Sequence, residues 1–224
     1  MFVNTNNIDQ ECDFIYSIIN SIPSIDGLWF PKNINKIDNI EKLIDYNFVE
    51  LSCKILSILL NDNTLELNEI IKKAFNFPVK IKTISSNMHF LETFHGPTLT
   101  FKDFGARFMA CYLESKLKNN SQNILVSTSG DTGSAIASAF YKKKNLTVTI
   151  LYPNKSISEM QELQMTTFDN NIASYGINTS FDICQSYVKK SLSNKILNKK
   201  INIISANSIN LARLLPQCLY YFYS

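Results

Sequence analysis

Histidine is scarce in this sequence of 224 residues, which contains only His89 and His95. Protein zinc sites combine several imidazole or thiolate ligands, so a histidine-based metal centre is not expected. The sequence also lacks an apolar run long enough to span a bilayer, and its first residues lack the basic and apolar regions of a secretory signal. We therefore expect neither a membrane segment nor secretion.

Closely spaced cysteines are missing as well. The five cysteines lie far apart in the chain, at positions Cys12, Cys53, Cys111, Cys184 and Cys218. None belongs to a Cys-x-x-Cys pair, and their number is odd. This pattern is typical of reduced thiols, so we expect a cytoplasmic protein without a disulfide framework.

A strong charge of either sign is absent, since the formal net charge is only +3. The lysines that cluster form short runs at 142–144, 189–190 and 199–200, where they suit the negative ends of helix dipoles. No basic face is interleaved with aromatic residues, as nucleic-acid-binding surfaces usually are. We therefore expect no nucleic-acid partner.

The first part of the chain predicts helices. Apolar residues recur at helical spacing over 8–22, 48–60 and 65–75, and residues 27–31 form a short extended piece between breakers. We assign residues 1–80 to a helical N-terminal segment. This segment shows no chemistry of its own.

From residue 79 the pattern changes to that of an α/β protein. Residues 79–84 alternate with period two, as a half-buried strand does, and 88–93 form a second strand. Apolar strands then alternate with amphipathic helices, which indicates a parallel sheet covered on both faces. Ligands of such sheets bind beyond the carboxyl ends of the strands. We assign residues 81–224 to this α/β part, with strands at 123–128, 146–152, 172–175 and 201–204 and helices at 104–118, 134–143, 158–168, 181–193 and 209–222.

One lysine stands out in the stretch 95–105, where a Gly-Pro turn leads into a helix. Lys102 follows Phe101 and is separated from Phe104 by a single aspartate. An ammonium group between two aromatic rings either reaches out to water or is held in an apolar pocket with a lowered pKa. The second environment is the one that a Schiff-base lysine needs. From these residues alone both interpretations remain open.

The loop 127–133 is the second candidate for chemistry. It ends a strand and opens a helix, with two glycines that allow a close backbone approach and several hydroxyl groups. Free N–H groups at the start of a helix favour an anion such as a carboxylate or phosphate. The alternative is an ordinary turn in which Asp131 or Thr132 caps the helix, and the loop alone does not separate the two.

A third polar loop, 205–210, follows the last predicted strand. Asn207 or Ser208 could simply cap the next helix there. Together, however, a reactive lysine, an anion-binding loop and an amide at neighbouring strand ends fit pyridoxal phosphate chemistry on an amino-acid substrate.

These motifs resemble the threonine synthase family, in its bacterial and fungal branch, within the tryptophan-synthase-β-like (fold-type II) enzymes that use pyridoxal phosphate. The resemblance covers essentially the whole chain in order, through residues 27–31, 95–105, 129–133, 150–153, 181–185, 205–210 and 213–215. It implies conversion of O-phospho-L-homoserine and water to L-threonine and phosphate, the last step of threonine biosynthesis.

The resemblance also assigns residues to roles. Lys102 would bind the cofactor as a Schiff base and act as a proton shuttle once released. Asp131 stands where related branches carry an asparagine that contacts the cofactor, and Asn207 is assigned to the cofactor too. The loop residues that would bind the substrate carboxylate are Ser129, Gly130, Thr132 and Gly133.

Three departures from the family pattern temper this reading. We expect the chain to match only the N-terminal half of the family, without the glycine-rich loop that binds the cofactor phosphate. Residues 154–156 and Glu159 replace a Gly, a basic residue and a Pro, and 169–170 is Asp-Asn where Gly-Gly is usual. We therefore expect weak cofactor binding and no activity from the isolated chain. A non-catalytic truncated remnant and a related phospho-lyase remain alternatives, and the oligomeric state is unassigned.

Overall fold

A four-stranded parallel sheet forms one side of the molecule in a computed structural model that describes residues 1–23, 26–117, 120–154 and 156–224. Its strand order is β8-β7-β6-β9. The strands are β6 (Gln122–Ser127), β7 (Leu146–Pro153), β8 (Ile172–Ile177) and β9 (Ile203–Ser205). In the register of the sheet, Ile124 lies beside Val148 on one side and Ile204 on the other.

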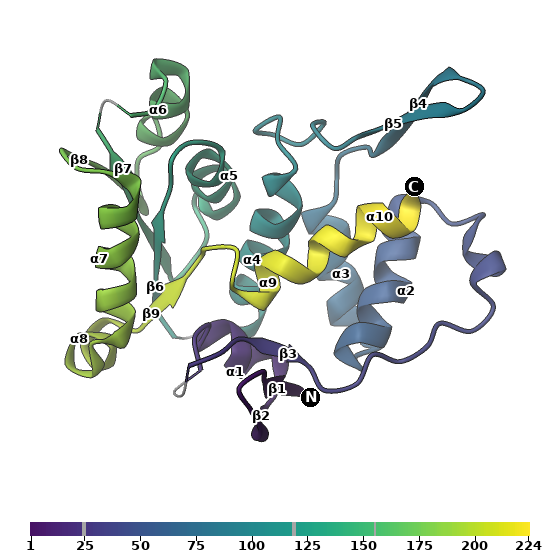
Figure 1. Ribbon diagram of the computed structural model, residues 1–224, viewed down its shortest axis with the longest axis horizontal. Coiled ribbons are helices and arrows are strands. Elements are labelled where there is room, and N and C mark those ends of the chain that lie inside the picture. The colour runs from purple at the N-terminus through teal and green to yellow at the C-terminus, as the bar shows by residue number, and fades with distance from the viewer. Residues whose placement is uncertain (24–25, 118–119, 155) are drawn as a thin grey trace.

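Helices cover both faces of this sheet (Figure 1). Helix α7 (Phe181–Ser193) lies against one face, while α5 (Asp131–Phe140) lies against the other, with α4 (Lys102–Lys116) behind it. Helix α6 (Glu159–Thr166) connects β7 to β8, and helix α8 (Lys195–Ile201) follows α7 before β9, so strands and helices alternate along the chain. The predicted α/β fold is confirmed, although the short helix α8 was not predicted. The predicted end of the lysine helix, residue 118, lies outside the described residues.

The N-terminal segment begins with a small antiparallel sheet rather than a helix. Its order is β2-β1-β3, with β1 (Phe2–Asn4), β2 (Asn7–Cys12) and β3 (Trp29–Pro31). The predicted extended piece at 27–31 is thus confirmed over β3. The predicted helix at 8–22 is wrong over its first residues, because residues 7–12 pair with β1 instead.

Helix α1 (Phe14–Ile19) starts only after this pairing ends. The Asp13 carboxylate accepts a hydrogen bond of 2.7 Å from the backbone N–H of Tyr16 and so caps the first turn. Tertiary strand pairing has overridden the helical spacing of the apolar residues, which an isolated segment cannot reveal.

The next helices agree with the sequence pattern. Helix α2 (Phe48–Leu60) has a capping box in which the side chains of Asn47 and Glu50 satisfy each other's backbone N–H groups. Helix α3 (Leu65–Ala74) is capped by Thr64. A single turn, η1 (Ile40–Leu43), interrupts the long connection that precedes α2.

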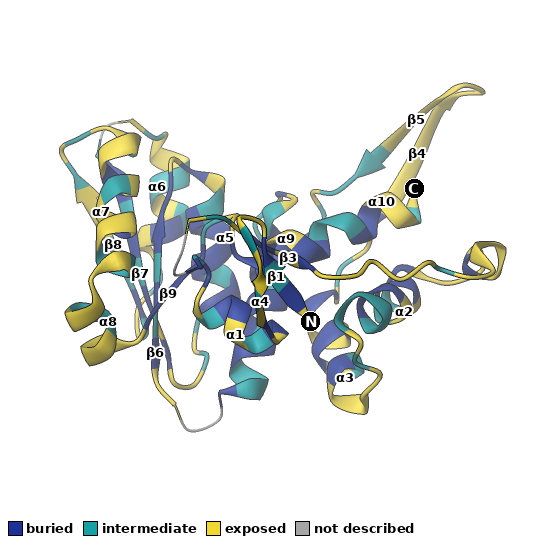
Figure 2. Cartoon of the chain, turned by 60° about the horizontal axis from the view of Figure 1, so that its bottom comes forward, coloured by how far each residue is buried: buried dark blue, intermediate teal, exposed yellow. Residues whose placement is uncertain are grey.

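The predicted strands near residues 79 and 88 form an antiparallel hairpin that protrudes from the body (Figures 1 and 2). They are β4 (Lys80–Ser85) and β5 (Met88–Glu92), paired with Ile81 opposite Leu91. The strands are confirmed, but the prediction of half-burial is wrong for residues 80–84, whereas Val79 just before the strand is buried. All six residues of β4 are exposed, because the hairpin joins neither of the other two sheets.

The end of the chain is broken into short pieces. Helix α9 (Leu211–Leu214), the 3-10 turn η2 (Leu215–Cys218) and helix α10 (Leu219–Tyr223) replace the single helix predicted at 209–222. The break coincides with Pro216, whose ring has no N–H to continue an α-helical ladder.

Helix α4 lies at the centre of the hydrophobic core. Phe104 and Phe108 are completely buried. The ring centroid of Phe104 lies 5.5 Å from that of Phe48, and the ring centroid of Phe108 lies 6.5 Å from that of Phe14. The core therefore joins residues of the N-terminal segment to the α/β part. Lys102, the first residue of α4, projects from this densely packed element, which favours a well-defined geometry.

Within the described residues, no helix combines the length and the apolar character that a bilayer crossing requires.

Candidate active site

A cavity of about 310 Å³ surrounds Lys102 at the carboxyl ends of β6 and β9. Four of the predicted site residues line it, namely Lys102, Ser129, Thr132 and Asn207. They come from three segments that are far apart in the sequence, and the parallel sheet brings these segments to one edge. The position is the one expected for a ligand of an α/β sheet.

A buried carboxylate shapes the turn that leads into Lys102. Asp103, which is 1% exposed, accepts hydrogen bonds from the Thr98 N–H at 2.9 Å and from the Thr98 hydroxyl at 2.8 Å. A Cβ atom at Gly96 would lie less than 3.0 Å from three atoms of the Asp103 side chain, so only glycine fits there. The turn and the helix start are therefore locked together, and this orients the neighbouring lysine.

The environment of Lys102 disfavours its charged form. Partial burial lowers the pKa of the Lys102 amine, the nearby charge of Arg213 lowers it further, and Asp131 opposes the shift. The Phe101 ring, whose centroid lies 4.8 Å from Nζ, acts in the opposite direction, because an aromatic face attracts a cation. Of the two environments that the sequence left open, the structure supports the pocket with a lowered pKa, because desolvation penalises the protonated amine.

Arg213 is a residue to which sequence reasoning gave no role. It is completely buried, and its Nη1 atom donates a 2.5 Å hydrogen bond to the carbonyl oxygen of Ala206. Its Nε atom has no partner, and among the described residues no carboxylate forms an ion pair with it. Burial lowers the pKa of the guanidinium to about 10. A buried cation without a counter-charge is costly unless a ligand compensates it.

The two glycines of the loop 127–133 do not line the cavity; they let the loop fold back on Thr128. The Thr128 hydroxyl accepts 3.0 Å hydrogen bonds from the N–H groups of Gly130 and Gly133. Gly130 has φ +152°, a conformation that side chains other than hydrogen rarely allow. At Gly133 a Cβ atom would clash with the side chain of Met165. These glycines hold Ser129 and Thr132 in position at the cavity.

Asp131 lies outside the cavity wall. It is exposed, and its carboxylate accepts a 3.0 Å hydrogen bond from the amide of Gln161. Its influence on Lys102 is electrostatic. His95, one of the two histidines, contacts Glu92 at 2.7 Å and does not line the cavity either.

Unpartnered polar atoms concentrate in this cavity. Five buried side-chain atoms of the described residues lack a hydrogen-bond partner, and three of them belong to residues that line it: Ser127 Oγ, Asn207 Oδ1 and Arg213 Nε. Buried polar groups are nearly always paired in native proteins. Their clustering fits a site built for a polar ligand with several oxygen or nitrogen atoms, as pyridoxal phosphate is.

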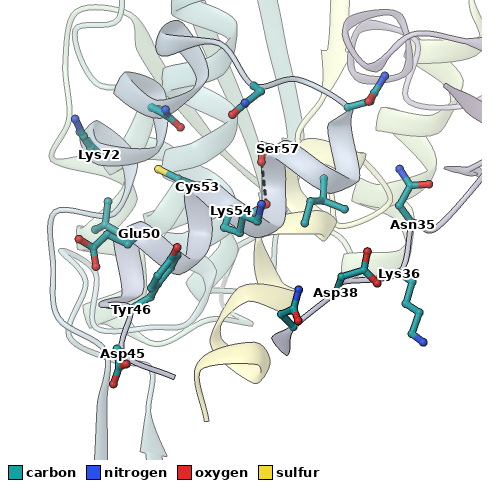
Figure 3. Close-up of a pocket in the computed structure, with 16 residues that line it drawn as sticks. Asn35, Lys36, Asp38, Asp45, Tyr46, Glu50, Cys53, Lys54, Ser57 and Lys72 are labelled. Carbon is teal, nitrogen blue, oxygen red and sulfur yellow. Dashed lines mark hydrogen bonds between the residues drawn. The ribbon is translucent and has the colours of Figure 1, made fainter. Parts of the chain in front are cut away.

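A larger hollow lies elsewhere among the described residues. It measures about 1130 Å³ and is bounded by residues 35–46 and by the outward faces of α2 and α3 (Figure 3). Cys53 and Lys54 are among its lining side chains, but none of the five unpartnered atoms lies there. Size alone does not mark a site, so we place the candidate active site at Lys102. The described residues contain no group of His, Cys, Asp and Glu that could hold a metal ion.

Comparisons with known proteins identify relatives of the whole chain. The chain is 41% identical over 221 residues to threonine synthase from Haemophilus influenzae, covering 98% of this chain and 52% of the relative. It is 39% identical to threonine synthase from Escherichia coli with the same coverage. The chain thus spans about half the length of the curated relatives it matches. The predicted resemblance to threonine synthase is confirmed.

Solved structures give the same result. The crystal structure of threonine synthase from Escherichia coli superposes with a TM-score of 0.92 at 38% identity, covering 100% of this chain and 53% of that one. Threonine synthase from Brucella melitensis, solved with PLP bound, superposes with a TM-score of 0.89 at 28% identity, covering 99% and 50%. Residues 82–212 match the family described as pyridoxal-phosphate-dependent enzymes, a stretch that includes Lys102 and most of the cavity. The chain therefore belongs to the family of pyridoxal-phosphate-dependent enzymes.

Proposed function

We propose that this chain forms the lysine-bearing part of a cytoplasmic threonine synthase, which converts O-phospho-L-homoserine and water into L-threonine and phosphate. The observation that carries the proposal is Lys102, an amine with a lowered pKa in a cavity with unpartnered polar atoms at the carboxyl edge of a parallel sheet. The named relatives support this reaction over others of the same fold, because both are threonine synthases and both match 98% of this chain.

Lys102 is the residue that would hold pyridoxal phosphate. When bound, this cofactor supplies an electron sink for negative charge that develops on an amino-acid substrate. A lysine whose amine is partly desolvated is the nucleophile that an aldehyde cofactor requires. Asn207, whose Oδ1 atom is buried without a partner, offers a polar contact to the same ligand.

The cavity also favours an anionic substrate. Arg213 contributes a positive charge that no carboxylate of the described residues pairs with. Ser129 and Thr132 bring hydroxyl groups to the start of α5, where free N–H groups add positive potential. A substrate with a carboxylate and a phosphate, such as O-phospho-L-homoserine, matches this charge.

Lys102 is also the candidate for proton transfer in the cavity. A lowered pKa increases the fraction of neutral amine, so that Nζ can accept a proton from the substrate and return it at another atom. Asp103 accepts two hydrogen bonds from Thr98 and so holds the turn before Lys102 in place. The start of the helix is therefore rigid, and this fixes the direction of the lysine side chain.

The alternative of a non-catalytic remnant draws its support from the replaced glycines at 169–170. Asn170 adopts a left-handed conformation with φ 56°, which asparagine accepts more readily than most residues. The side chain of Asn171 bonds to the carbonyl oxygens of Phe140 and Leu146 and secures the same turn. The replacement is therefore compatible with an intact fold, and we favour the enzyme. The replacement at Lys155 lies outside the described residues.

We further propose that the 224-residue chain alone binds the cofactor weakly and does not turn over substrate, since it spans about half of the relatives' length. The experiment incubates the chain with pyridoxal phosphate, reduces it with borohydride and maps the modified lysine by mass spectrometry. We expect the label on Lys102, and its loss in Lys102→Arg, while a Lys116→Arg variant keeps it. Labelling spread over exposed lysines without preference for Lys102 would refute the assignment. Threonine formation by the chain alone would refute the proposed inactivity.

A further inference from the structure

Two consecutive hydroxyl groups at the end of β6 differ in their hydrogen bonding. Ser127 and Thr128 are each 2% exposed, and both residues line the Lys102 cavity. The Thr128 hydroxyl accepts from two N–H groups and donates to the carbonyl oxygen of Gly130 at 3.0 Å. Among the residues that the structure describes, the Ser127 hydroxyl has no hydrogen-bond partner. Thr128 is therefore saturated by the protein, whereas Ser127 is not.

The backbone at Ser127 cannot readily shift to give its hydroxyl a hydrogen-bond partner. Ser127 is the last residue of β6 and pairs with Leu151 of β7, so its backbone is held from one side; the pairing of β6 with β9 ends at Leu125. Side chains alternate along a strand, and its neighbour Val126 points into the apolar core with 0% exposure. A buried hydroxyl without a partner lowers stability compared with alanine, unless something that enters the cavity pairs with it.

We propose that Ser127 is a ligand-binding residue whose hydroxyl donates a hydrogen bond to an oxygen atom of the molecule bound beside Lys102. The inference rests on the proposed function and assigns the role to one of the four hydroxyls in the loop. Thr128 is, by contrast, a structural residue that closes the loop.

An anionic oxygen is the acceptor that this part of the cavity favours. Arg213, which lines the same cavity, brings an unpaired positive charge and a free Nε–H donor. Two unpartnered donors in one cavity suit oxygen atoms of carboxylate, phosphate or phenolate groups, and hydrogen bonds to charged acceptors are stronger than neutral ones. Pyridoxal phosphate and a phosphorylated substrate both carry such oxygens.

The test compares Ser127→Ala with Thr128→Val and Thr128→Ser. Thermal unfolding is followed by circular dichroism without ligand. We expect Ser127→Ala to leave the midpoint unchanged or slightly higher, and Thr128→Val to lower it by about 5 °C because three hydrogen bonds are lost. Thr128→Ser, which keeps the hydroxyl, stays close to the native chain and serves as the control if Thr128→Val does not fold. A Ser127→Ala midpoint as low as that of Thr128→Val overturns the proposal.

The second readout is borohydride trapping at Lys102 over a range of pyridoxal phosphate concentrations. We expect Ser127→Ala to raise the half-saturating concentration about three- to tenfold, as the loss of one hydrogen bond does. In a parallel series, inorganic phosphate competes with trapping by unphosphorylated pyridoxal. A Ser127→Ala effect on pyridoxal phosphate supports a contact to the cofactor, and an effect on inorganic phosphate alone supports a contact to a phosphate oxygen.

Two results separate this inference from the function on which it rests. Equal trapping and equal phosphate competition in Ser127→Ala and the native chain, with Lys102 still labelled, overturn the role of Ser127 alone. Failure of the native chain to trap any ligand at Lys102 overturns the proposed function and this inference with it.

Discussion

The backbone of Arg213 passes so close to Gly105 that a Cβ atom at position 105 would lie less than 3.0 Å from the Arg213 carbonyl oxygen. Gly105 belongs to the first turn and a half of α4, and Arg213 to α9. The absence of a side chain at Gly105 thus allows α9 to rest on α4. This close approach carries the buried guanidinium to the cavity that Lys102 also lines.

Replacement of this glycine tests the contact. Gly105→Ala forces a methyl group against backbone atoms that cannot rotate away, and we expect a loss of about 1–3 kcal/mol in the free energy of unfolding. Urea denaturation measures the loss. Gly176→Ala is a matched control, because the three atoms nearest to its methyl group would be side-chain atoms of Tyr152, the closest at 3.0 Å. Equal losses in both variants would show that the close approach to Arg213 is unimportant.

The charge of Arg213 is expected to act on Lys102. Arg213→Met keeps much of the side-chain volume but removes a like charge, so the pKa of the Lys102 amine should rise toward its usual value. Competitive acylation of lysines at several pH values, read by mass spectrometry, measures this pKa. At a given pH below its pKa the variant should react more slowly at Lys102, while Lys142 reacts as before. An unchanged profile at Lys102 would contradict the coupling.

The opposite change is expected at Asp131. This carboxylate favours the protonated amine, so Asp131→Asn should lower the pKa of Lys102 further and shift its reactivity to lower pH. The same acylation experiment applies. Because Asp131 is exposed and its partner Gln161 can bond to asparagine as well, we expect little change in stability. Shifts of the same sign in Asp131→Asn and Arg213→Met would rule out a simple electrostatic origin.

The turn before Lys102 should depend on Asp103. Asp103→Ala removes two hydrogen bonds to Thr98 from a buried carboxylate, and we expect a loss of about 2–4 kcal/mol in the free energy of unfolding. Asp103→Asn retains an acceptor oxygen and should lose less. Urea unfolding followed by tryptophan fluorescence reports both values. A variant as stable as the native chain would mean that the turn forms without this carboxylate.

The end of the chain should promote association. Tyr221 is 70% exposed and Phe222 is 44% exposed, and Leu214 in the preceding helix α9 is exposed as well. Exposed apolar patches of this kind lead to self-association. We expect concentration-dependent species in size-exclusion chromatography, and a shift toward monomer in the double variant Tyr221→Gln, Phe222→Gln. A native chain that elutes as a monomer at all concentrations would contradict this expectation.

Regular elements with a strong local signal were predicted well. Helices α2 and α7 have the bounds predicted from their apolar spacing, 48–60 and 181–193. The start of α2 is also secured by the capping residues Asn47 and Glu50. The helix expected over 8–22 failed because strand β2 pairs with β1, a contact that no local pattern contains. The alternation of β4 does not establish half-burial, because period two indicates a strand and not whether a core faces it.

The α/β alternation, the lysine between aromatic residues and the family resemblance follow from the sequence alone, because they depend on local periodicity and on motifs in order. The sequence could not show that Lys102 and Arg213 share a cavity, since this depends on where the sheet and the close approach at Gly105 place distant segments. Nor could it separate Ser127 from Thr128, because both are hydroxyls at a strand end. Only the tertiary structure shows which of the two already has its hydrogen bonds and which one is left to bind a ligand.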